Sequence, residues 1–138
     1  MTKNKKILII EDDLFVRELY ENIFRKKGYD VVSAADGEEG LNKALTEKAD
    51  IILLDIMLPV KSGIEVLKSL KKSSTPSQKT PVFLLTNLGQ ESIIKEAFRL
   101  GAVGYLLKVK LLPHQIVSEV ENFFKGETNR EFYLKKLM

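Results

Sequence analysis

The sequence has no cysteine and a single histidine. The absence of cysteine excludes disulfides and thiolate metal sites, and one histidine is too few for a histidine-rich metal centre. No apolar run approaches the ~18 residues that a membrane-spanning helix needs. The short run at residues 7–10, behind the N-terminal lysines, is also too short for a signal peptide. We therefore expect a cytoplasmic protein that does not associate with a membrane.

Positive charge is in small excess. The 22 lysines and arginines outnumber the 19 acidic residues by three, which is weak support for nucleic-acid binding. The basic excess lies at the N-terminus and between Lys61 and Lys79, where a solvated surface is the simpler interpretation. The length of 138 residues fits one domain with a buried core. No direct contact with nucleic acid is expected.

Short apolar runs alternate five times with segments of helical periodicity. The pattern predicts strands at residues 6–10, 30–34, 50–54, 82–85 and 103–107, and helices at 14–27, 36–47, 62–72, 90–100 and 113–125. The first and third runs are too apolar for half-exposed strands and are typical of buried parallel ones. The predicted fold class is therefore α/β, a (βα)5 domain whose parallel sheet is covered by helices on both faces.

Local signals predict several helix ends. Asp36 and Ser62 each stand three residues before a glutamate, as in a capping box, and Gly28 and Gly101 are typical helix stops. Leu112 stands where a polar cap is expected, so the last helix is predicted to begin poorly capped. Residues 1–125 are expected to form the domain, and residues 126–138 a short tail with no effector domain.

Polar residues follow four of the predicted strands. Strand one is followed by Glu11-Asp12-Asp13, strand three by Asp55, strand four by Thr86 and strand five by Lys108. In open parallel α/β sheets, sites form beyond the carboxyl ends of the strands. Crowded carboxylates need a cation, and an all-oxygen site suits Mg²⁺ better than Zn²⁺. We expect these residues to form one site with Mg²⁺ as cofactor.

Each of these residues also has a plain alternative. Asp13 is more simply a cap of the first helix. Asp55 has an alternative as a turn residue, Thr86 as a β-branched strand residue and Lys108 as a surface lysine. Their joint placement at one sheet edge favours the functional interpretation.

The spaced motifs resemble the receiver domain of response regulators in two-component signalling. The matching pieces, over residues 5–125, are Ile-Leu-Ile-Ile-Glu11-Asp12-Asp13, Leu-Leu-Asp55-Ile-Met57-Leu-Pro59-Val-Lys-Ser-Gly63, Phe-Leu-Leu-Thr86 and Gly-Tyr105-Leu-Leu-Lys108. The resemblance implies a flavodoxin-like sheet with strand order 2-1-3-4-5. It also implies that Asp55 accepts a phosphoryl group from a histidine kinase or a histidine phosphotransfer protein.

The same resemblance assigns roles to the other site residues. Glu11, Asp12, Asp55 and the backbone carbonyl of Met57 would hold Mg²⁺, and Thr86 and Lys108 would contact the phosphoryl group. Tyr105 would turn inward together with Thr86, and the surface of helix four, strand five and helix five would change for a downstream protein or a weak homodimer. Such a chain catalyses its own phosphorylation and dephosphorylation without being a classical enzyme.

Some positions depart from the common family pattern or bear on the lifetime of the phosphoryl group. Val109 replaces the usual proline after Lys108, and a cis bond before valine costs ~3–4 kcal/mol, so we predict a trans bond. Asn87 is predicted to cap helix four together with Gln90. Met57 and Leu88, each two residues beyond a site residue, are expected to shield the phosphoryl group from water and slow its loss.

Other functions remain open at this point. The chain is alternatively a relay intermediate that passes its phosphoryl group to a histidine phosphotransfer protein, or a receiver fragment of a longer regulator. A hydrolase of the haloacid dehalogenase type is disfavoured, because it needs an aspartate where Met57 stands. A degenerate receiver is disfavoured because the acidic, hydroxyl and lysine positions are all filled.

Overall fold

A computed structural model describes residues 4–87 and 91–137. The helices and strands are, in chain order, β1 (Lys6–Ile10), α1 (Leu14–Lys26), β2 (Asp30–Ala34), α2 (Gly37–Thr46), β3 (Ile51–Asp55), α3 (Gly63–Lys72), a 3-10 turn η1 (Pro76–Lys79), β4 (Val82–Thr86), α4 (Glu91–Arg99), β5 (Gly104–Leu107), α5 (Pro113–Phe124) and α6 (Arg130–Lys136). The five predicted strands and five predicted helices are therefore all present, with small shifts at their ends.

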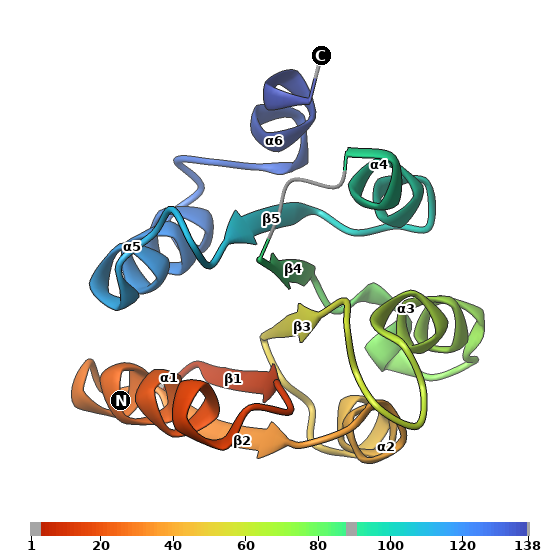
Figure 1. The fold of residues 1–138 in the computed structure, drawn as a ribbon, viewed down its shortest axis with the longest axis horizontal. Helices are drawn as coiled ribbons and strands as arrows, with labels where there is room; N and C mark the ends of the chain where they lie inside the picture. Colours follow the sequence, from red (N-terminus) through yellow and green to blue (C-terminus); the bar gives the residue numbers. More distant parts are fainter. Residues whose placement is uncertain (1–3, 88–90, 138) are drawn as a thin grey trace.

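The strands form one parallel sheet in the order β2-β1-β3-β4-β5. Figure 1 shows α1 and α5 on one face of the sheet and α2, α3 and α4 on the other. This arrangement confirms the predicted (βα)5 flavodoxin-like fold with strand order 2-1-3-4-5. Because every strand runs the same way, the carboxyl ends of β1, β3, β4 and β5 meet at one edge.

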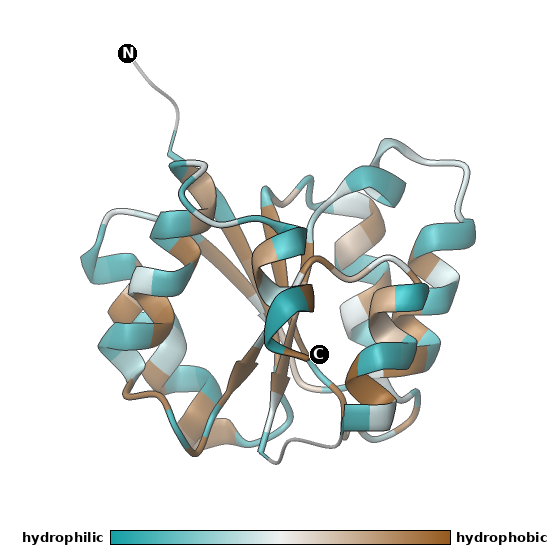
Figure 2. Ribbon diagram, turned by 90° about the horizontal axis from the view of Figure 1, so that it is seen from above, coloured by the Kyte–Doolittle hydropathy of each residue, from teal (hydrophilic) through white to brown (hydrophobic). Residues whose placement is uncertain are grey.

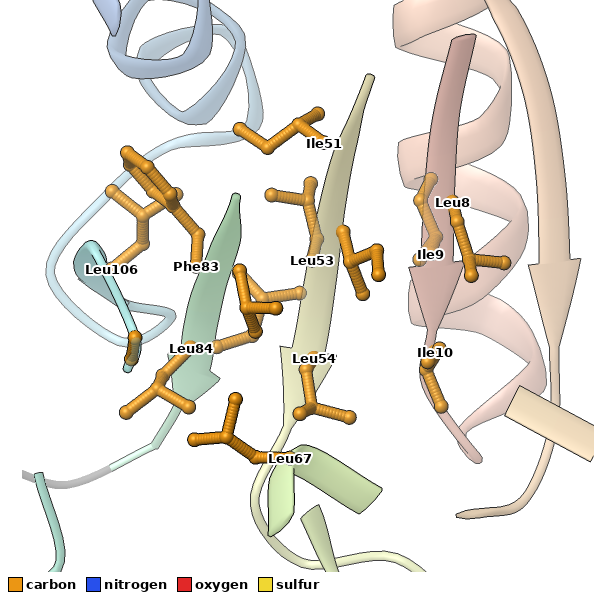
Figure 3. Packing of buried hydrophobic residues seen from close by; sticks show 14 of the residues in the cluster. Leu8, Ile9, Ile10, Ile51, Leu53, Leu54, Leu67, Phe83, Leu84 and Leu106 are labelled. Atoms are coloured by element: carbon orange, nitrogen blue, oxygen red, sulfur yellow. The ribbon is translucent and has the colours of Figure 1, made fainter. Parts of the chain in front are cut away.

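The core lies in the three central strands and the helix faces that cover them. All residues of β3 and β4 are buried, and so are the last four of β1. Figure 2 shows the apolar strands between helices whose outer faces are hydrophilic, and Figure 3 shows how side chains such as Ile9, Leu53 and Phe83 fill the space around the strands. Burial on both faces explains why these strands are apolar without alternation.

Capping side chains fix the starts of α1, α2 and α3. The side chains of Asp13, Asp36 and Ser62 accept hydrogen bonds from the backbone N–H groups of Val16, Glu39 and Glu65 at 3.0, 2.8 and 3.2 Å. Asp13 is thus a helix cap, as its plain alternative predicted. The start of α5 is different: Leu112 offers no side-chain cap, and its N–H donates instead to the side chain of Gln115 at 2.7 Å.

Two elements were not predicted from the sequence. The polar loop before β4 contains the turn η1, and the segment described above as a tail contains the helix α6. Asn129 caps α6 through the N–H of Phe132 at 3.1 Å, and Tyr133 is buried. Figure 1 shows α6 beside β5, the edge strand of the sheet. The segment after residue 125 is therefore partly packed on the domain.

Candidate functional site

The predicted site residues come together at the carboxyl edge of the sheet. Glu11 directly follows β1, Asp55 and Thr86 end β3 and β4, and Lys108 follows β5. The strand register brings Asp55 beside Leu85 and Thr86 beside Leu107, and the backbone N–H of Lys108 donates to the Thr86 carbonyl at 2.8 Å. The four strand ends are held in one layer by the sheet itself.

Lys108 joins two of the carboxylates. Its Nζ donates to Oε1 of Glu11 at 2.6 Å and to Oδ2 of Asp55 at 3.0 Å. The Glu11 side chain is 1% exposed, that of Asp55 8% and that of Lys108 10%. Burial by itself lowers the pKa of Lys108, but the hydrogen bond to Glu11 and the charge of Asp55 outweigh it and raise the pKa above its usual value. The ammonium group is therefore firmly charged at neutral pH.

Three carboxylates form a cluster that fits a hard divalent cation. Glu11, Asp12 and Asp55 each offer an oxygen within 4.8 Å of the others, and Asp12 faces solvent while the other two are buried. Oxygen donors, one of them open to water, are the ligands that Mg²⁺ prefers. The second oxygen of Asp55 accepts the N–H of Met57 at 3.1 Å, which holds the Asp55 carboxylate in place. A ligand role for the Met57 carbonyl remains a prediction.

The cluster opens into a cleft of about 520 Å³. Its lining includes the carboxylates and Lys108, together with Tyr20, Asn87 and Val109. Tyr20 of α1 is a neighbour of the site that was not predicted from the sequence. Burial raises the pKa of its hydroxyl, while Lys108 opposes this shift and the nearby carboxylates add to it. No local motif marks Tyr20, because its place in the cleft depends on how α1 packs.

The two predicted switch residues lie on neighbouring strands. Thr86 is buried at the end of β4. Tyr105 is half-buried on β5, beside Leu84 and three residues before Lys108. Its ring packs edge-to-face against Phe98 of α4, at 6.2 Å between centroids, and against Tyr133 of α6, at 5.9 Å. Tyr105 thus links the strand that carries Lys108 to two helices on the surface.

Several predictions concern the loops around the site. Within residues 4–87 and 91–137 no peptide bond is cis, which confirms the predicted trans bond between Lys108 and Val109. Leu88 and Gln90 lie outside the described residues. The cap of α4 by Asn87 and Gln90, and the shielding role of Leu88, therefore stay predictions. Met57 lines the cleft, with 75% of its surface exposed.

Comparison with known proteins gives one consistent result. The family described as "Response regulator receiver domain" matches residues 7–121. The alkaline phosphatase synthesis transcriptional regulatory protein PhoP of Bacillus subtilis is 42% identical over 105 residues, which are 76% of this chain and 42% of that protein. Sporulation initiation phosphotransferase F of the same organism is 35% identical over 105 residues, 76% of this chain and 82% of that protein.

Solved structures agree with the sequence relatives. The chemotaxis protein CheY4 of Vibrio cholerae superposes with a TM-score of 0.80 at 29% identity, covering 87% of this chain and 98% of that one. The chain spans about a third to a half of the transcriptional regulators it matches, 42% of PhoP, 53% of ResD and 32% of PfeR. Among the described helices, none has the length and apolar character needed to span a membrane.

Proposed function

Because the chain belongs to the family of response regulator receiver domains, we propose that Asp55 accepts a phosphoryl group and makes the chain a signalling switch. The observation that carries this proposal is the bridge from Lys108 to Asp55 and Glu11, at 3.0 and 2.6 Å, beside the open carboxylate of Asp12. A buried nucleophile is thereby held next to a fixed positive charge and a set of cation ligands.

The chemistry follows from these contacts. An oxygen of Asp55 attacks the phosphorus of a phosphohistidine, the P–N bond breaks, and the imidazole leaves with the bonding pair and takes up a proton. The product is an acyl phosphate, whose hydrolysis or onward transfer restores the carboxylate. Mg²⁺ held by Glu11, Asp12 and Asp55 would neutralise phosphoryl oxygens in this transfer. Lys108, bound to Asp55, contributes a second positive charge.

The proposal includes partners of two kinds. A histidine kinase or a histidine phosphotransfer protein supplies the phosphoryl group, and the surface of α4, β5 and α5 serves a downstream protein or a weak homodimer. The relay function is a second candidate, because one relative that the chain nearly spans is named a phosphotransferase. The relatives named transcriptional regulators favour the third possibility, a receiver within a longer protein. Transfer from the phosphorylated chain to a purified histidine phosphotransfer protein would distinguish the relay.

Asp55→Asn is expected to abolish phosphorylation, because an amide oxygen is not a competent nucleophile here. Intact-mass measurement after incubation with acetyl phosphate and Mg²⁺ should show one added phosphoryl group in the wild type and none in the variant. Asp13→Asn is the matched control, since Asp13 caps α1 and asparagine caps equally well. Labelling that persists in Asp55→Asn, or that is unchanged by EDTA, would disprove the assignment.

The lifetime of the phosphoryl group is expected to be long. Hydrolysis needs a water in line with the breaking bond, and the thioether of Met57 orients water poorly. Met57→Asn should therefore release phosphate severalfold faster than the wild type when Mg²⁺ is saturating, as followed by loss of the added mass over time. Val60→Asn, at another exposed position of the same loop, serves as control. An unchanged rate in Met57→Asn would show that water access does not limit hydrolysis.

A further inference from the structure

Helix α6 covers the edge of the sheet between α4 and α5. It contacts β5, and Figure 1 shows it beside that strand, between α4 and α5. The edge of β5 would otherwise be open, and exposed edges invite pairing with another chain. The surface of α4, β5 and α5, proposed above as the output surface, is thus occupied in part by the chain itself.

Tyr133 is the central anchor of α6. It is 1% exposed, and its ring packs edge-to-face against Phe83 of β4, at 5.2 Å, and against Tyr105 of β5, at 5.9 Å. Its hydroxyl lies 3.4 Å from a carboxylate oxygen of Glu119 on α5. One side chain therefore touches two strands of the sheet and a helix of the output surface.

Arg130 fastens the start of α6 to the end of α4. Its guanidinium donates to the backbone carbonyls of Phe98 and, at 3.3 Å, Ala102, and it lies 5.4 Å from the centre of the Phe98 ring. The Phe98 carbonyl lies in the last turn of α4, where carbonyls carry partial negative charge, and it also accepts the N–H of Gly101 at 3.0 Å. At the other end of α6, Leu137 is 8% exposed. Both ends of the helix are thus held.

The contacts that hold α6 are connected to the proposed phosphorylation site through β5. Tyr105, which touches Tyr133, stands three residues before Lys108, which binds Asp55. Phe98, which touches Arg130, also touches Tyr105. A displacement of Tyr105 would therefore remove one ring contact of Tyr133 and one ring contact of Phe98, the residue that Arg130 touches.

We propose that α6 is an intramolecular cover of the output surface, seated while Asp55 is a free carboxylate and loosened when Asp55 is phosphorylated. The proposal rests on the proposed function, because inward movement of Tyr105 is what withdraws the ring from Tyr133. A partner that binds α4, β5 and α5 then competes with α6, and phosphorylation decides the competition. Loss of one aromatic contact of this kind shifts an equilibrium by about 2- to 12-fold.

The absence of cysteine permits a direct test, because an engineered thiol is the only one in the chain. Leu137→Cys places a thiol under the cover, and Lys135→Cys places one on the exposed side of the same helix. Maleimide labelling of Leu137→Cys should be slow, and should accelerate by about 2- to 12-fold when beryllofluoride and Mg²⁺ are added. Labelling of Lys135→Cys should be fast and unchanged.

A second experiment changes α6 and measures binding at Asp55. Coupling between two sites is reciprocal, so a looser α6 should favour the phosphorylated form. Arg130→Ala loosens α6 and should tighten beryllofluoride binding by a similar factor, with Glu131→Ala as the control on the same helix. Fluorine NMR of the bound beryllofluoride separates the outcomes. No bound signal overturns the proposed function, and the cover with it. A bound signal with unchanged labelling of Leu137→Cys, or unchanged affinity in Arg130→Ala, overturns the cover alone.

Discussion

Lys108→Met is expected to slow phosphorylation of Asp55 by about 100- to 1,000-fold, the usual cost of losing one preorganised donor from a reacting centre. Methionine retains most of the length of the side chain and removes its charge. The 3.0 Å contact to Oδ2 of Asp55 places the ammonium beside the carboxylate that is proposed to accept the phosphoryl group. The initial rate of mass gain with acetyl phosphate, at saturating Mg²⁺, measures the effect.

The same change should lower the free energy of unfolding by about 3 kcal/mol at neutral pH, because it leaves the buried carboxylates of Glu11 and Asp55 without their cation. Mg²⁺ should stabilise the variant more than the wild type, since it replaces the missing charge. Urea denaturation with and without Mg²⁺ tests both statements. Lys110→Met, an exposed lysine two residues further on, is the control.

The pH dependence of this loss has a definite sign. Contacts with Glu11 and Asp55 raise the pKa of Lys108 in the folded chain, so its contribution to stability is complete below the ordinary lysine pKa of about 10.4. The contribution is lost as pH rises through the folded pKa. The gap in unfolding free energy between the wild type and Lys108→Met should therefore narrow only at strongly alkaline pH.

For the rate prediction, a phosphorylation rate in Lys108→Met equal to that of the wild type would contradict the role proposed for Lys108.

Most residues of the candidate site could be predicted from the sequence, because they stand at or directly after the ends of strands. An apolar run that stops at Asp55 or just before Glu11 fixes both the strand and the edge where the carboxylate emerges. Parallel connections then bring those ends together without any further information. The ion pairs that Lys108 forms with Glu11 and Asp55 were not predicted. The distances within the cluster and the burial of its side chains could be learned only from the structure.

Helix α6 was not predicted from the sequence, and the reason is physical. Asn129 is a good cap, and Tyr133 and Leu137 repeat at a spacing of four, which are genuine but weak signals. A helix of seven residues is unstable alone, and its support comes from Phe83 and Tyr105, far away in the sequence. Val60 is a similar case. Its φ of 71° is unfavourable for a β-branched residue, and nothing local predicts it.

Gly63 shows how a motif position acts through packing. A Cβ on Gly63 would lie 2.3 Å from the backbone oxygen of Asp55 and 2.8 Å from the Cα of Ile56. The N–H of Gly63 also donates to the Ile56 carbonyl at 2.9 Å. This hydrogen bond holds the start of α3 against the backbone of residues 55 and 56, so α3 cannot easily move away to make room for a Cβ. The close approach explains why the motif that begins at Asp55 ends in glycine.

Gly63→Ala is therefore expected to lower the free energy of unfolding by about 3 kcal/mol, the upper range for an overpacked site. It should also slow phosphorylation by about 100-fold, because the methyl group pushes on the backbone of Asp55, the proposed nucleophile. Urea denaturation and acetyl phosphate labelling, performed where the variant is fully folded, separate the two effects. Gly28→Ala is the control, since its φ of 93° makes alanine unfavourable but a Cβ there meets no atom within 4 Å. That control should lose about 1–2 kcal/mol of stability and keep its phosphorylation rate. A folded Gly63→Ala chain that is phosphorylated at the wild-type rate would show that the loop moves aside without disturbing Asp55.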